Sequence, residues 1–490
     1  MKHLPAAVRA TLAAATLLAG SFTTAFGADS SADELAALRE QLRALDQKIK
    51  VLERKQELAD EAAATAAKAA PKITVSDKGF SVASNDGANQ LKLRGLVQAD
   101  ARVFSNQDPA LTNNSTFLIR RARIIFEGTL AKNYSFLVVP DFAVNNTTTL
   151  QLVDAYVNAA ITPSLNVRIG RFREPVGLEQ LQSDSVAFFN ERSLVSQLLP
   201  NRDLGIQVWG DVLGGRLSYA VGVFNGIADG SNNNNNGEND QDKDIAARLF
   251  AQPWKNDGGS PLQGLGFGVG ASFGRQKPVT ANLTSGYRTD GQQTFFSYRT
   301  QGAGAASATN FSTVADGTTW RLSPQAYYYH GPFGFLGEYA LSTVNVRPNF
   351  PASFAGSPKV ELTNKAWQIA ASYVLTGEDA AYTGVVPATN FDWAAGTWGA
   401  FEVVARYDVL DLDNQAFVTP GSGYSSLADP AANPTKVSTL GLGLNWYLGK
   451  AVRLSFDWFH TQFDNNVAVP TRALLRADED AFITRLQVAF

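Results

Sequence analysis

Apolar and polar residues alternate one by one along most of the chain after residue 90. Between residues 440 and 448 every even position is apolar, and after the tight turn Gly449-Lys450 the alternation resumes from Val452 to Trp458. A period of two predicts β-strands with one apolar and one polar face. Sixteen such segments can be counted, near residues 90–103, 117–129, 133–144, 150–160, 166–173, 204–212, 216–225, 244–251, 264–274, 320–329, 333–344, 361–374, 399–409, 437–448, 451–462 and 481–490.

Two architectures use strands of this kind. A soluble sandwich buries the apolar faces, whereas an outer-membrane barrel turns them to lipid and lines a wet lumen with the polar faces. The polar faces here carry many charges and small residues, and aromatic residues such as Trp320 and Trp458 stand near segment ends. Short turns alternate with long loops, except at residues 375–398. Phe490 ends the chain on an amphipathic strand, which resembles the signal that barrel-assembly machinery recognises.

These features favour the barrel. We expect an all-β fold over residues 90–490, a closed sixteen-stranded antiparallel transmembrane β-barrel. Its location would be the outer membrane of a Gram-negative bacterium, where the apolar faces contact the membrane lipid.

A helical heptad pattern precedes the barrel, in residues 28–70. Apolar residues recur at alternating intervals of three and four, at Leu35, Leu38, Leu42, Leu45, Ile49 and Leu52. This spacing predicts a coiled coil, Pro71 ends the helix, and residues 71–89 are expected to be a linker. So narrow an apolar stripe cannot bury itself alone, so we expect self-association in the periplasm. A single amphipathic helix lying on the barrel or membrane is the alternative, and the seam does not decide between dimer and trimer.

Residues 1–27 have the features of an export signal. Lys2 and Arg9 form a basic start, residues 10–19 are apolar, and Ala25-Phe26-Gly27 offers small residues to a signal peptidase. An apolar stretch of about ten residues is too short to span a bilayer as a helix. We therefore predict a cleaved signal peptide, with a retained anchor as the alternative.

The composition argues against an enzyme. The chain has no Cys and three His, which excludes thiol nucleophiles and thiolate metal sites and leaves little material for a zinc centre or a His-dependent triad. The formal net charge of -3 argues against nucleic-acid binding. Gly270-Ala271-Ser272-Phe273-Gly274 matches a nucleophile elbow, but it lies within an alternating strand and no helix follows it. We expect no catalytic residue, no metal and no cofactor.

Arginines in the predicted strands are the candidate functional residues. Charges in a transmembrane strand are tolerated in the lumen and costly against lipid. Alternation places seven of them inward, namely Arg94, Arg121, Arg123, Arg171, Arg173, Arg406 and Arg453. A column of guanidinium groups would pass anions by replacing part of their hydration shell. The alternative is that these arginines pair with carboxylates such as Asp141 and Asp154 and brace the wall.

Residues 174–203 form the most informative connection. The segment is too long for a hairpin turn and holds its own apolar cluster, which is typical of a functional loop. Folded into the lumen it would narrow the pore, and a lid over the external mouth is the alternative. Acidic residues outnumber basic ones by five to two, and lysine is absent. The expected constriction residues are Glu179, Ser183, Asp184, Ser185, Arg192 and Arg202.

Several short runs carry a family resemblance. They are Arg120-Arg121-Ala122-Arg123, Asp154-Ala155-Tyr156-Val157, the run from Arg168 to Glu179, Pro200-Asn201-Arg202-Asp203-Leu204-Gly205, Phe224-Asn225-Gly226, Thr376-Gly377-Glu378-Asp379 and Ala405-Arg406-Tyr407. These runs resemble the phosphate-selective porin O/P family, and the resemblance covers the chain from about residue 90 to residue 490.

The resemblance implies a sixteen-stranded, trimeric channel whose third external loop folds inward, with an arginine ladder and an acidic residue near the constriction. The matching positions are Arg120 and Arg121 for the arginines and Asp154 for the acid. Strict alternation points Arg120 to lipid, and a β-bulge would reconcile the two assignments. Phosphate-selective members rely on a lysine in the inward loop, which residues 174–203 lack, so the family name is not a substrate assignment.

We therefore expect a homotrimeric outer-membrane porin for passive diffusion of small hydrophilic solutes, with a preference for anions such as phosphate. A general or cation-tolerant pore, favoured by the acidic loop, is one alternative. Another is a structural tether, in which the coiled coil joins the membrane to peptidoglycan.

Overall fold

The computed structural model describes residues 30–105, 115–143, 150–232, 241–278, 283–284, 286–349, 358–465 and 477–490. The chain divides into two compact units, Met1–Ala70 and Pro71–Phe490. The predicted signal peptide, residues 1–27, lies outside the described residues.

In the first unit the structure describes residues 30–70, where it has the helix α1 (Ser30–Ala69). Ion pairs one turn apart stabilise its polar side, for example Lys50 with Asp46 at 2.8 Å. The seam residues Leu38, Leu42 and Leu52 are each at least 60% exposed. The predicted helix is confirmed, and its assembly into a coiled coil stays a prediction. In the part of the chain that the structure describes, no helix is both long and apolar enough to cross a membrane.

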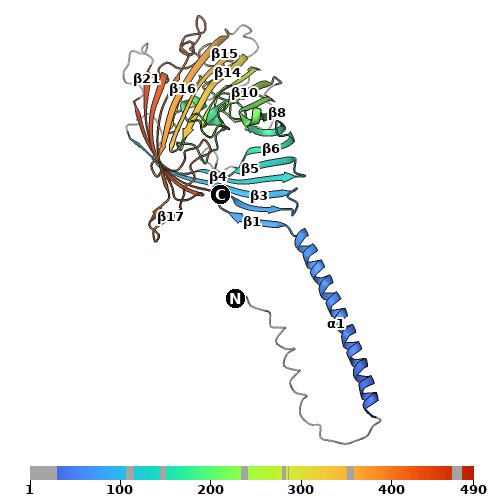
Figure 1. The fold of residues 1–490 in the computed structure, drawn as a ribbon. Coiled ribbons are helices and arrows are strands. Elements are labelled where there is room, and N and C mark those ends of the chain that lie inside the picture. Colours follow the sequence, from blue (N-terminus) through green and yellow to red (C-terminus); the bar gives the residue numbers. More distant parts are fainter. Residues whose placement is uncertain are drawn as a thin grey trace. The chain divides into compact units, whose positions relative to one another are not determined.

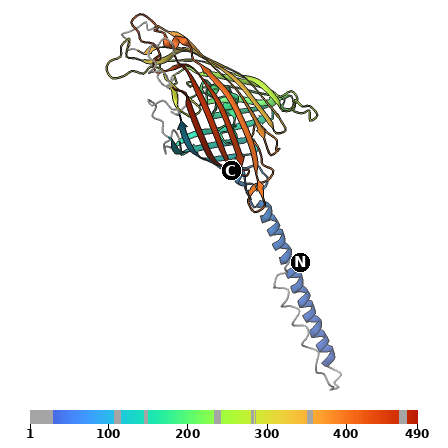
Figure 2. The ribbon, with the colours of Figure 1, turned by 90° about the vertical axis from the view of Figure 1, so that its left-hand side faces the viewer.

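The second unit is a closed antiparallel barrel of sixteen strands (Figures 1 and 2), as the alternation predicts. Each strand pairs with its neighbour in the chain, and the last strand pairs with the first to close the sheet. The strands are β3 (Gln90–Ser105), β4 (Thr116–Leu130), β5 (Tyr134–Asp141), β6 (Gln151–Thr162), β7 (Leu165–Arg173), β8 (Arg202–Val212), β9 (Leu217–Phe224), β10 (Asp244–Ala251), β11 (Leu265–Gln276), β14 (Ser312–His330), β15 (Phe333–Asn349), β16 (Val360–Val374), β19 (Ala400–Asp411), β20 (Pro434–Tyr447), β21 (Val452–Asn465) and β22 (Glu479–Ala489).

The faces of the wall follow the alternation. On β20, Leu440 and Leu442 are 39% and 45% exposed on the outer surface, whereas Thr439 and Asn445 are buried on the inner surface. Apolar side chains outside and polar side chains inside are the arrangement that a lipid-embedded barrel requires.

Residues 71–89 are not the linker that we expected. They contain a hairpin of β1 (Lys72–Ser76) and β2 (Gly79–Ala83), and β2 pairs with the start of β3. The physical reason lies in the closure of the barrel. Pairing between β22 and β3 begins only at Leu96, so residues 90–93 of β3 would leave an open edge, and β2 covers that edge.

The long connection 375–399 also has structure of its own. It contains a short hairpin of β17 (Phe391–Asp392) and β18 (Thr397–Trp398). The hairpin packs against the barrel wall, where the ring of Phe391 lies 5.3 Å from that of Trp446. This aromatic contact attaches the hairpin to the wall, at an end of the barrel where most of the other turns are short.

Two long connections on the other side fold into the barrel. Residues 174–201 contain α2 (Leu178–Leu181) and η2 (Leu194–Gln197), and the connection after β11 contains β12 (Tyr287–Arg288) and β13 (Thr294–Phe296). Two further short helices are η3 (Leu213–Gly215) and η6 (Asn414–Phe417). The apolar side chains of the first two connections share one buried cluster, which includes Leu194, Leu198, Tyr287 and Phe296.

Candidate functional site

The segment 174–201 crosses the interior of the barrel. Its backbone N–H groups donate hydrogen bonds to carboxylates on three strands: Leu178 to Glu338 on β15 at 2.7 Å, Leu194 to Asp408 on β19 at 3.1 Å, and Asn190 to Asp457 on β21 at 2.7 Å. The wall carboxylates thereby satisfy donors that the irregular backbone cannot pair by itself. We call this segment the lumen loop.

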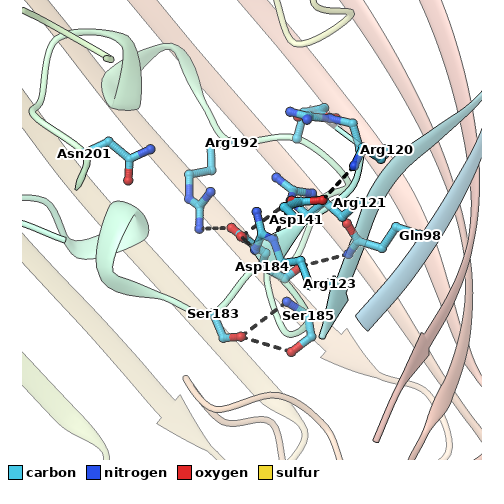
Figure 3. A network of polar contacts seen from close by, with 12 residues as sticks. Gln98, Arg120, Arg121, Arg123, Asp141, Ser183, Asp184, Ser185, Arg192 and Asn201 are labelled. Carbon is cyan, nitrogen blue, oxygen red and sulfur yellow. Dashed lines mark hydrogen bonds and ion pairs between the residues drawn. The ribbon is translucent and has the colours of Figure 1, made fainter. Parts of the chain in front are cut away.

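Arginines from the wall and the lumen loop surround Asp184 (Figure 3). Its carboxylate contacts Arg192 at 2.5 Å, Arg173 at 2.9 Å, Arg121 at 3.5 Å, Arg202 at 3.9 Å, and Arg123. Burial alone would raise the pKa of Asp184, but these positive charges outweigh burial and hold the pKa well below its usual range. The arginines around Asp184 thus favour its ionised form.

Glu191 is the second anion of the lumen loop. Arg120 binds it with two hydrogen bonds, of 2.7 and 3.0 Å, while Arg102 and Arg485 contact it at 2.7 and 2.9 Å. Burial again raises the pKa of Glu191, and the three arginines lower it further than burial raises it, to well below its usual range. The bidentate geometry fixes the loop against β4.

A β-bulge turns Arg120 inward. In the pairing of β3 with β4, Gln98 lies opposite Arg121 and Ala99 lies opposite Ile119, so Arg120 has no partner in the register. An extra residue of this kind reverses the alternation beyond it. Ile119 accordingly lies on the exposed outer surface, and both Arg120 and Arg121 face the lumen.

Two cavities meet at this cluster. The inner cavity, of about 660 Å³, lies at the short-turn end of the barrel, where Lys450 lines it. The outer cavity, of about 360 Å³, is lined by Arg120 and by long-loop residues such as Ser231. Three residues, Arg123, Asp184 and Arg202, line both cavities. We call these three residues and the arginines around them the neck.

The neck carries an excess of positive charge. Eight arginines take part in the ion pairs of Asp184, Glu191 and their neighbours, namely Arg102, Arg120, Arg121, Arg123, Arg173, Arg192, Arg202 and Arg485. They face five carboxylates, Asp100, Asp141, Asp154, Asp184 and Glu191, so three positive charges remain in excess within this network. Asp184 and Glu191 of the lumen loop are thus outnumbered by the arginines that they contact.

Comparison with known proteins decides the class of this barrel. The model of the family described as phosphate-selective porin O and P matches residues 91–490. The chain belongs to this family. Porin O of Pseudomonas aeruginosa is 24% identical over 437 residues, which cover 84% of this chain and 91% of Porin O. The protein is therefore an outer-membrane porin, a channel rather than an enzyme.

Solved structures with a similar fold include two other outer-membrane proteins. The outer-membrane channel DcaP of Acinetobacter baumannii is 11% identical with a TM-score of 0.49, covering 82% of this chain and 98% of DcaP. The trimer form of OmpT of Vibrio cholerae is 11% identical with a TM-score of 0.47, covering 82% of this chain and 100% of OmpT.

The other predicted arginines of this porin divide between the cavities and the wall. Arg94 lines the inner cavity and pairs with Glu127 at 2.6 Å, and Arg171 lines the outer cavity. Arg453 also lines the inner cavity and donates a hydrogen bond to the lumen loop, at the carbonyl oxygen of Ala187 (3.0 Å). Arg406 lines neither cavity, because it is buried between Asp290 and Asp408, at 2.8 and 3.2 Å. For Arg406 the geometry fits the bracing alternative.

The predicted constriction residues also divide. Ser183 and Ser185 lie 3.0 Å apart at their hydroxyl groups and line the inner cavity beside Asp184. Glu179 instead accepts hydrogen bonds from Ser193 at 2.5 Å and Gln368 at 3.0 Å, and lines neither cavity. Arg202 is the first residue of β8 rather than a loop residue, and it pairs with Asp154 at 3.0 Å.

Sequence reasoning misses part of this site. Arg102 is two residues from Asp100, and Arg485 is two residues from Gln487, so each arginine lies on the polar face of its strand. The alternation could therefore have found both arginines. For the connection after β11 the sequence predicts only a long loop. It instead reaches the opposite wall, where the Thr289 hydroxyl donates to Glu479 at 2.8 Å, and its Arg288 lines the outer cavity. No periodic signal marks such a docked loop.

Proposed function

We propose that this porin conducts small anions passively, with the neck as its constriction and selectivity filter. The observation that carries the proposal is the excess of arginine over carboxylate where the two cavities meet. The inner cavity is lined by residues of the short turns and the outer cavity by residues of the long loops, and Arg123, Asp184 and Arg202 line both, so we expect a permeating solute to pass these three residues.

Guanidinium groups suit this task for two reasons. They offer several N–H donors that replace part of the hydration shell of an anion, in a planar geometry that matches phosphate and carboxylate. Asp184 and Glu191 compete for the same donors, which keeps each site of moderate strength, so that a bound anion can leave again. Phosphate and related small anions are the solutes that this chemistry favours.

The test is the zero-current potential of the purified protein in planar bilayers across a KCl gradient, repeated with phosphate present. We expect the zero-current potential to lie toward the equilibrium potential of chloride, and we expect phosphate to reduce the chloride current. A zero-current potential that lies toward the equilibrium potential of potassium, or close to zero, would contradict the proposal and favour a general or cation-tolerant pore.

We also infer that the porin is a homotrimer held in part by α1. The seam residues of α1, such as Leu38 and Leu42, are exposed within one chain, and a second and third copy would bury them. Deletion of residues 31–70 should lower the molar mass measured by analytical ultracentrifugation in detergent, or lower the temperature at which the trimer dissociates. An unchanged assembly would mean that α1 does not hold the trimer together, and it would favour the alternative in which α1 tethers the membrane to peptidoglycan.

A further inference from the structure

Arg168 on β7 lines the inner cavity and lies among three aromatic rings. Its guanidinium carbon lies 4.3 Å from the ring centre of Tyr156, 5.2 Å from that of Trp209 and 5.4 Å from that of Phe172. Within the described ranges, no carboxylate forms an ion pair with Arg168, and its buried Nε has no hydrogen-bond acceptor. Arg168 is thus a cation held by aromatic rings, with N–H donors that the protein leaves unused.

Arg94 and Arg202 differ from Arg168 in this respect. Both line the same cavity, and each has a carboxylate partner, Glu127 at 2.6 Å and Asp154 at 3.0 Å. Arg453, which lies over the ring of Tyr447, donates instead to the carbonyl oxygen of Ala187 in the lumen loop. An aromatic face attracts a guanidinium through its quadrupole, but it does not take the place of an oxygen acceptor. An anion that enters the inner cavity can therefore bind Arg168 without displacing a carboxylate.

The surroundings of Arg168 indicate which anion fits. Apolar side chains make up much of the lining of the inner cavity, including those of Leu96, Ile125, Leu137, Val139, Tyr156 and Phe172. The outer cavity is lined mainly by charged and polar residues. A volume of about 660 Å³ is within the range of small-molecule sites. The inner cavity therefore combines a free cationic donor with an apolar wall.

We propose that Arg168, Tyr156 and Phe172 form a binding subsite for organic carboxylates that carry an apolar ring, a class represented by benzoate. The carboxylate accepts N–H donors of Arg168, and the ring lies against the apolar lining. This proposal deepens the proposed function and rests on it, since the subsite lies in a cavity that the permeating anions cross.

The experiment uses the full-length porin in planar bilayers in KCl. Benzoate, acetate or phosphate is added on the side of the inner cavity, and the concentration that halves the chloride current is measured for each. We expect benzoate to act at a concentration about tenfold lower than acetate, since the two share a carboxylate and only benzoate buries a ring. Equal concentrations for benzoate and acetate, or no block by benzoate, would overturn the subsite.

Variants locate the effect. Arg168→Gln should bring the ratio of the half-blocking concentration of acetate to that of benzoate close to one. Tyr156→Leu should lower the same ratio by a smaller amount. Arg168→Lys keeps the charge but loses the planar donor set, so it should also lower the ratio. A wild-type ratio in Arg168→Lys and Arg168→Gln alike would overturn the assignment. Arg216→Gln, a change at an exposed arginine of a short turn at the same end, is the matched control.

Failure of this inference can be told from failure of the proposed function. A zero-current potential on the chloride side together with equal block by benzoate and acetate removes the subsite and keeps the anion channel. A potential on the cation side removes the anion channel itself, and the subsite with it. Heat-dependent migration of each variant in gel electrophoresis shows whether the barrel has folded.

Discussion

The lumen loop contacts two walls of the barrel that bury charge in opposite ways. Toward β3, β4, β7 and β8 it presents side-chain carboxylates, Asp184 and Glu191, which meet arginines. Toward β15, β19 and β21 it presents backbone N–H groups, which meet the wall carboxylates Glu338, Asp408 and Asp457. The two anions at the centre of the loop thus bind an arginine-rich wall with their side chains, whereas the loop binds the carboxylates of the other wall with its backbone.

The difference shows that inward charge alone does not define a channel lining. The arginine wall lines both cavities, whereas Glu338, Asp408 and Asp457 line neither. Backbone donors cover the carboxylate wall and hold its charges out of contact with the solute. Both walls have the same alternating pattern in the sequence, so the loop decides which of them is functional.

The largest effect should follow from breaking the contact with the carboxylate wall. Glu338→Leu leaves the N–H groups of Leu178 and Glu179 and the hydroxyl of Ser323 without their acceptor, at a cost of roughly 3 kcal/mol in the free energy of unfolding. The loop should then leave the wall, and single-channel conductance should rise. Glu338→Gln keeps an acceptor and is the control. Unchanged conductance in Glu338→Leu would show that this anchor does not hold the loop.

The next effect should come from the arginine wall. Replacing Arg120 and Arg121 together by Gln reduces the excess of positive charge at the neck from three to one. The ratio of chloride to potassium permeability should fall about tenfold, as read from the zero-current potential. Arg347→Gln, which changes a pair with Asp316 away from both cavities, should leave the ratio unaltered. An equal loss in both variants would mean that overall charge, not the neck, sets selectivity.

Asp184→Asn removes a negative charge from the neck, so it should strengthen anion binding, by a smaller factor than the loss of the two arginines weakens anion selectivity. The arginines around Asp184 would lose their competing anion, and the concentration of phosphate that halves the chloride current should fall about threefold. Asp184→Glu keeps the charge and should stay close to the wild type. A rise in the half-blocking concentration would instead show that Asp184 is needed to position the arginines for phosphate.

The smallest effect is expected from pH. The pKa of Asp184 and that of Glu191 lie well below their usual ranges, because burial, which raises them, is outweighed by the adjoining arginines. A lowered pKa in the folded state means that the stabilising charge is present above the ordinary pKa and is lost only as the pH falls through the lowered one. The zero-current potential should therefore be constant from about pH 8 down to about pH 4. A change centred near pH 4 would place these carboxylates in ordinary surroundings.

Much of the barrel could be predicted from the alternation, because a lipid-facing wall imposes a strict period of two. The parity argument also selects Arg121, Arg123 and Arg173 for the neck. It cannot place Arg120, because a bulge at this residue reverses the alternation. The position of the bulge depends on how β4 pairs with Gln98 and Ala99 of β3, which the sequence around Arg120 does not reveal. The hairpin at 72–83 escapes for another reason, because its strands are short and its role is to cover an edge of β3.

The partners of the lumen loop were beyond the reach of sequence. Asn190 and Asp457 lie 267 positions apart, and their contact depends on the diameter of the barrel and the path of the loop. The acidic composition of residues 174–203 even suggested a cation-tolerant pore, because a count of charges does not show which arginines the carboxylates will meet.

The position of Arg485 has a consequence for the order in which the molecule assembles. This residue of β22 contacts Asp100 of β3 at 2.6 Å and Glu191 of the lumen loop at 2.9 Å, so one side chain joins the first barrel strand, the last strand and the loop. Contacts between such distant parts of a chain form late, since the intervening segments must be ordered first. The partners of Glu191 are complete only when β22 has paired with β3. The porin therefore acquires its finished neck in the same step that seals its wall.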